Sequence, residues 1–146
     1  MRAESVKRVA DLFFRYEEGE RDFRGAKLSQ ANLIGVDLQG ADLSGADLTG
    51  ATLLGADLRG VKLVRADLTR AVLAQADIRG ADLRGARLSG IDLRKATYDG
   101  ATRFPAGFSP IDGGLMPQSG FMRRVRASDA TGVLRGVDSN RRAGSK

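Results

Sequence analysis

Apolar residues recur at every fifth position of this chain, from Phe23 to Tyr98. Between residues 21 and 100 the sequence divides into sixteen five-residue units, whose third position is always apolar or aromatic. Ala fills the first position in twelve units, Asp or Asn the second in ten, and Gly the fifth in eleven. A period of five matches neither an α-helix nor a simple strand, and on a helix the stripe would spiral away from any one core.

A short extended piece followed by a turn does fit this period. In each unit the first and third side chains point one way and the second and fourth the other. The fifth residue turns the corner, where Gly tolerates a positive φ. Repetition of this unit predicts a solenoid whose coils stack through backbone hydrogen bonds at roughly 4.8 Å. The predicted core is the third-position series: Phe23, Leu28, Leu33, Leu38, Leu43, Leu48, Leu53, Leu58, Leu63, Leu68, Leu73, Ile78, Leu83, Leu88, Leu93 and Tyr98.

The units ADLSG, ADLTG and ADLRG follow a pattern, A(D/N)LxG, that resembles the pentapeptide-repeat family over about residues 21–105. The resemblance implies an all-β solenoid: a right-handed quadrilateral parallel β-helix with four units per 20-residue coil. Sixteen units then make about four coils. The opening GERDFRGAKLSQANL and the closing ATRFPAGF are similar to the ends of cyanobacterial members.

Both ends of such a solenoid need a cap. Residues 1–20 are assigned to an N-terminal cap, with a helix expected over 4–18, because one face carries Val6, Val9, Leu12, Phe13 and Tyr16. Gly19 then stops the helix. Residues 106–117 are expected to form a C-terminal capping segment. Its residues Phe108, Leu115 and Met116, together with Phe104 just before it, are expected to supply an irregular apolar lid. Residues 118–146 lose the repeat and predict a flexible basic tail.

Composition excludes several chemistries. Among its 146 residues the chain has no His, Cys or Trp, so a Ser-His-Asp or Cys-His nucleophile system and a His/Cys zinc site are excluded. A filled rod also offers no cleft for acid–base catalysis. We therefore expect no enzyme activity, no catalytic residues, no cofactor and no metal. No apolar run reaches the roughly 18 residues of a membrane span, and we expect no membrane partner and a cytoplasmic location.

If residues twenty apart stack, each outer face of the rod becomes a ladder. One face carries Asp37, Asp57, Asp77 and Thr97, with Arg59 and Arg79 alongside, and it suggests either a cation site, a mimic of nucleic-acid phosphates, or solvated Asp–Arg pairs. The last of these is favoured. A second face carries the hydroxyl series Ser29, Thr49, Thr69 and Ser89, for which a structural role is expected.

A third face departs from the polar pattern. Its two outward rows hold the candidate partner-binding residues, which we call the apolar strip: Ile34, Thr52, Leu54, Val72 and Ala74. Scattered tolerance of apolar residues on a β surface is the alternative explanation. In the third coil the corners are Arg65, Arg70 and Gln75 in place of Gly. With Lys62, the two arginines are a candidate contact for an acidic partner, although a different turn type at these corners is the simpler interpretation.

The favoured function is a noncatalytic protein-interaction module. We expect a rigid rod with a regulatory role and an unidentified protein partner, as a monomer or with weak self-association. One alternative is nucleic-acid association through the basic tail, which lacks a recognisable reading motif. Another is a DNA mimic that protects gyrase, a role known among pentapeptide-repeat proteins. Residues 21–105 carry 13 basic and 10 acidic side chains, which is the wrong sign for imitating DNA.

Overall fold

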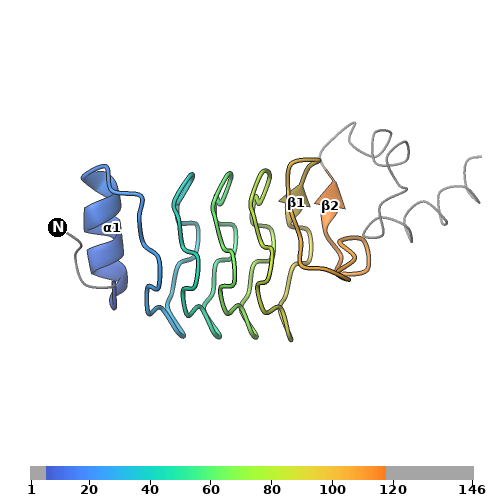
Figure 1. Ribbon diagram of the computed structural model, residues 1–146, viewed down its shortest axis with the longest axis horizontal. Helices are drawn as coiled ribbons and strands as arrows, with labels where there is room; N and C mark the ends of the chain where they lie inside the picture. Colours follow the sequence, from blue (N-terminus) through green and yellow to red (C-terminus); the bar gives the residue numbers. More distant parts are fainter. Residues whose placement is uncertain (1–5, 118–146) are drawn as a thin grey trace, which may run out of the picture.

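The computed structural model describes residues 6–117. Its body is a stack of similar turns, with the helix α1 (Val9–Glu17) at one end and the short parallel strands β1 (Thr97–Tyr98) and β2 (Met116–Pro117) at the other (Figure 1). Parallel bridges link second-position residues twenty apart, from Asp22 with Asp42 through to Asp77 with Thr97. The basic tail predicted for 118–146 lies outside the described residues.

Backbone hydrogen bonds hold each turn to the next. In the unit 51–55, the N–H of Leu53 donates to the carbonyl of Val72 at 2.6 Å, and the N–H of Gly55 donates to that of Ala74 at 2.9 Å. At the corner between this unit and the next, Ala56 N–H donates to the carbonyl of Leu53 at 3.0 Å. Repetition of these bonds satisfies most backbone groups of the rod without long strands.

First and third positions fill the interior, as predicted. Leu53 and Leu58 are each 1% exposed and Ala56 is fully buried, so large and small side chains alternate in a narrow core. Leu88 is the exception in the predicted core series: it is half-buried. It lines a shallow depression beside residues 105–108 near the end of the rod, where no complete turn follows to cover it.

Helix α1 is shorter than the predicted 4–18. It begins at Val9, and Arg8 before it is extended, with φ −138° and ψ 148°. The cause is tertiary: the carbonyl of Val6 accepts a hydrogen bond from Lys27 N–H at 2.6 Å, which fixes this segment against the first turn of the rod. Gly19, with φ 100°, follows the end of the helix as expected.

The helix packs one side on the rod. Leu12 is fully buried, and the Tyr16 hydroxyl donates to the carbonyl of Gln39 at 2.8 Å. Phe13, assigned from the sequence to the buried stripe, is 42% exposed, so that part of the prediction was wrong. It lies at the side of the helix, where the rod no longer covers it.

Corners without Gly have the same conformation as corners with it. Arg65 and Arg70 have φ 60° and Gln75 has φ 62°, against 66° at Gly55. The expectation of a different turn type at these corners was therefore wrong. Their amides make the same bonds between turns, such as Arg65 N–H to the carbonyl of Arg84 at 3.0 Å, so the stack imposes the left-handed conformation.

Corner glycines differ in the atoms that surround them. Their replacement by Ala should therefore lower the unfolding free energy by different amounts. At Gly85 (φ 74°) an added Cβ would lie 3.0 Å from Cγ of Arg65, whereas at Gly55 it would meet nothing within 4 Å. Gly55→Ala should cost about 1–2 kcal/mol from the left-handed backbone alone, and Gly85→Ala more. Urea unfolding of both variants measures the difference. Arg65→Ala should remove that difference, and its persistence would contradict the contact.

The segment 101–117 closes the far end with a changed register. Arg103 bridges Asp82, twenty-one residues away, so one residue has been inserted after the last regular unit. The Phe104 ring meets Tyr98 edge-on at 5.7 Å between centroids and stacks on Phe108 at 5.2 Å. Leu115 is buried, as a lid residue should be, but Met116 is 52% exposed and does not cover the core.

Candidate interaction surface

Backbone pairing places the apolar strip on one face. Bridges join Asn32 to Thr52, Thr52 to Val72, and Val72 to Asp92 in one row. In the adjacent row, Gly35 N–H donates to the carbonyl of Leu54 at 2.8 Å, and Gly55 N–H to that of Ala74 at 2.9 Å, which stacks Ile34, Leu54 and Ala74. The five residues are therefore contiguous across three turns.

Exposure falls along this row. Ile34 is 57% exposed, Leu54 is half-buried, and Ala74 is only 9% exposed. Ala74, predicted to face outward, is in effect buried because its short side chain lies below its neighbours. It lines a shallow groove with Leu54, Val72, Gln75, Asp92, Arg94 and Lys95.

Helix α1 extends the strip at its other end. Phe13, Tyr16 and Glu17 line a second shallow groove together with Ile34, Val36 and Asp37. The exposed Phe13 ring thus belongs to the same surface as Ile34. Sequence reasoning missed Phe13 as a surface residue because helical periodicity alone assigns it to the buried side.

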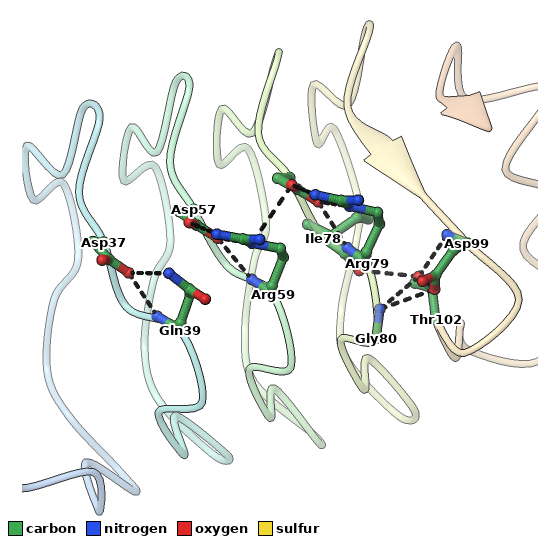
Figure 2. Close-up of polar contacts among 10 residues, drawn as sticks. Asp37, Gln39, Asp57, Arg59, Ile78, Arg79, Gly80, Asp99 and Thr102 are labelled. Carbon is green, nitrogen blue, oxygen red and sulfur yellow. Dashed lines mark hydrogen bonds and ion pairs between the residues drawn. The ribbon is translucent and has the colours of Figure 1, made fainter. Parts of the chain in front are cut away.

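The face with stacked aspartates is a chain of ion pairs (Figure 2). Arg59 Nε and Nη2 donate to the Asp57 carboxylate at 2.8 and 2.6 Å, and Arg79 makes the same two bonds to Asp77 at 2.9 and 2.6 Å. Arg59 Nε also lies 3.7 Å from Asp77 Oδ2 of the next turn. Asp57 and Asp77 are therefore each paired with an arginine, as the favoured interpretation of this face predicts, whereas Asp37 accepts hydrogen bonds from the backbone and side-chain amides of Gln39 at 3.1 and 3.2 Å.

These contacts leave little for a cation to bind. In the part of the chain that the structure describes, no group of three or more acidic side chains could hold a metal ion. The guanidinium bonds lower the pKa of Asp57 and Asp77, mainly through the side-chain hydrogen bonds of Arg59 and Arg79. Asp92 is held similarly by Arg94, which lowers its pKa to about 2.

Lowered carboxylate pKa values predict loss of stability in acid. The folded state binds protons less readily than the unfolded chain, so the stabilisation is complete above pH about 4 and disappears as the pH falls toward 2. We expect the melting temperature to drop across that interval. Asp92→Asn should be less stable than the natural chain at pH 7, and the gap should close by pH 2. A constant gap would contradict the assignment.

The basic residues Lys62, Arg65 and Arg70 are all exposed. The backbone of Lys62 bridges Asp42 and Asp82, and the stems of Arg65 and Arg70 extend over Gly85 and Gly90 of the next turn. The two arginines stand at successive corners. On the hydroxyl face, Ser29 Oγ donates to the carbonyl of Thr49 at 3.2 Å, and Thr69 Oγ1 to Asp67 Oδ1 at 2.6 Å.

A narrow filled core, turns stacked every twenty residues and flat outer faces define the class: a β-helical repeat protein. The family model described as pentapeptide repeats (8 copies) matches this chain twice, over residues 22–55 and 53–90. The chain belongs to the pentapeptide-repeat family. Proteins of this family fold as right-handed quadrilateral β-helices and are generally noncatalytic, so the predicted fold class is confirmed at this level.

Solved structures of the same family resemble this chain. The pentapeptide repeat protein alr5209 from Nostoc PCC 7120 is 43% identical, with 80% of this chain and 100% of that one covered and a TM-score of 0.46. A thylakoid-lumen pentapeptide repeat protein from Arabidopsis thaliana is 28% identical (55% and 63% covered, TM-score 0.39). Rfr23 from the cyanobacterium Cyanothece 51142 is 32% identical (57% and 60%, TM-score 0.36).

Two further findings are negative. A search of curated protein sequences found no match. Within residues 6–117, no helix has both the length and the apolar character that crossing a membrane requires.

Proposed function

We propose that this protein is a noncatalytic protein-interaction module and that its contact surface is the apolar strip together with Phe13. The observation that carries the proposal is the exposure of Ile34 (57%) and Phe13 (42%) on one side of the molecule. These two side chains line the same groove, and Leu54 and Val72 continue the apolar surface along the rod.

Burial of apolar area favours this surface over the others. Removing apolar surface from water contributes roughly 25 cal/mol per Å². The Asp–Arg pairs on the neighbouring face already satisfy one another, and exposed ion pairs add little net affinity. Lys62, Arg65 and Arg70 remain a proposed secondary contact for an acidic partner, because charge at the edge of an interface steers association.

We infer further that residues 21–105 form a rod of about four coils, closed by an N-terminal cap within 1–20 and a C-terminal cap within 106–117. The burial of Leu12 and Leu115 supports the two caps. A cytoplasmic location is likewise proposed, and cell fractionation tests it.

The contact surface is tested with the double variant Ile34→Ser/Leu54→Ser, whose side chains are not part of the core. Binding partners recovered by pulldown with the natural chain should be lost with this variant, while its melting temperature should stay within a few degrees. Val64→Ser is the matched control, since Val64 is also half-buried in the fourth position of its unit. Retained binding by the folded double variant would exclude the strip.

A further inference from the structure

We propose that the occupant of the apolar strip is a second copy of this chain, bound antiparallel about a twofold axis that passes beside Leu54. The inference rests on the proposed function, which makes the strip a contact surface. A twofold interface brings the same surface of both copies together, so the strip must be complementary to itself.

Shape provides the first complementarity. The row Ile34, Leu54, Ala74 descends from a long exposed side chain to a short buried one, and both grooves lie on this face. A twofold axis at Leu54 puts the protruding Ile34 of one copy opposite Ala74 of the other. The protruding end of each tapered surface then lies against the recessed end of the other, whereas a parallel arrangement would bring Ile34 against Ile34 and leave both Ala74 ends apart.

Charge provides the second complementarity between the two copies. The groove at the helix end contains the carboxylates of Glu17 and Asp37, both exposed. The groove at the opposite end contains Arg94 and Lys95 with Asp92. Arg94 pairs with Asp92 at 2.8 Å, which leaves Lys95 as the net positive charge there. Antiparallel pairing places the acidic end of each copy against the basic end of the other, and parallel pairing would oppose like charges.

The size of the surface limits the strength of this dimer. The apolar strip spans three turns that are about 4.8 Å apart and continues onto one side of helix α1. Its area is therefore a few hundred Å². Stable complexes bury about 800 Å² per partner. We therefore expect a reversible dimer with a Kd on the order of 100 μM.

Sedimentation equilibrium of the full chain, from about 10 μM to 1 mM, tests the dimer. The natural chain should shift from monomer to dimer over this range, Leu54→Arg should remain monomeric, and Val64→Arg should behave as the natural chain. Val64 lies two units later along the chain than Leu54, hence on the opposite side of a four-sided rod. A natural chain that stays monomeric at 1 mM, or a Val64→Arg variant that alone abolishes association, would overturn the proposal.

Charge reversal tests the orientation. Glu17→Lys and Lys95→Glu should each weaken the dimer several-fold, and the double variant, which restores opposite charges across the axis, should recover most of the loss. Additive weakening in the double variant would exclude the antiparallel arrangement.

Cross-linking tests the orientation of the dimer independently. The chain has no cysteine of its own, so an introduced cysteine is the only reactive thiol in each copy. A short bis-maleimide suits two β faces packed about 10 Å apart. Ile34→Cys mixed with Ala74→Cys should cross-link efficiently, and each variant alone should cross-link poorly. Efficient cross-linking of Ile34→Cys with itself would overturn the orientation.

These outcomes separate the dimer from the wider function. A monomeric natural chain overturns self-association alone, and the pulldown with Ile34→Ser/Leu54→Ser still decides whether the strip binds another protein. A dimer that resists Leu54→Arg overturns the strip as the dimer surface.

Discussion

Leu53→Asp is expected to unfold the protein. Leu53 is 1% exposed in the narrow interior, where a carboxylate would find neither water nor a partner, at a cost of several kcal/mol. Total stabilities of ordinary domains are only about 5–15 kcal/mol, so the cost is a large share of the whole. The β signal in circular dichroism and the cooperative melting transition should both be lost.

The matched control is the next residue, Leu54→Asp. Leu54 is half-buried with its side chain in an outward row, so the same chemical change should leave the fold intact. If Leu53→Asp folds with natural stability, or if both variants unfold alike, the inward and outward assignment of the repeat is wrong.

Leu12→Ala is expected to have the second largest effect, a loss of about 2–5 kcal/mol. Leu12 is the fully buried residue of α1, and its removal leaves a cavity where the helix meets the first turn. Since each turn of a solenoid is stabilised by its neighbours, an uncovered first turn should also weaken those that follow. Chemical unfolding monitored by circular dichroism measures the loss.

Phe14→Ala is the control for that prediction. The Phe14 side chain is 66% exposed on the same helix, so its removal should change the unfolding free energy by about 0.5 kcal/mol or less. Equal effects of the two substitutions would mean that α1 does not pack through Leu12.

The sequence predicts the inside and outside of the rod well, because a five-residue period leaves only one way to bury Leu58 and Ala56 together. The composition of each face also follows from the sequence once four units make one coil. As expected, the backbone of Asp57 bridges those of Asp37 and Asp77. These features depend on the local geometry of the five-residue unit, and that unit is repeated along the whole rod.

Contacts between distant segments explain what the sequence did not predict. The start of α1 depends on the hydrogen bond between Val6 and Lys27, and the exposure of Phe13 depends on where the rod ends beneath the helix. At Arg65 the preference against a positive φ is overridden by the amide bond to the next turn. For the candidate surface, the sequence grouped Ile34 with Leu54 but could not add Phe13 or show that Ala74 is buried.

One extra residue between Tyr98 and Arg103 is accommodated at a corner of the rod. The insertion interrupts the ladder, and Gly80 N–H turns instead to two side chains, Asp99 Oδ1 at 3.1 Å and Thr102 Oγ1 at 3.2 Å (Figure 2). A single inserted residue is thus tolerated at a corner where a polar side chain replaces the missing acceptor. Gain of five residues would move every later unit to the next face, whereas duplication of twenty would lengthen all four faces and preserve their chemistry. Insertion of a whole coil should therefore preserve the faces of this rod, whereas insertion of a single unit should not.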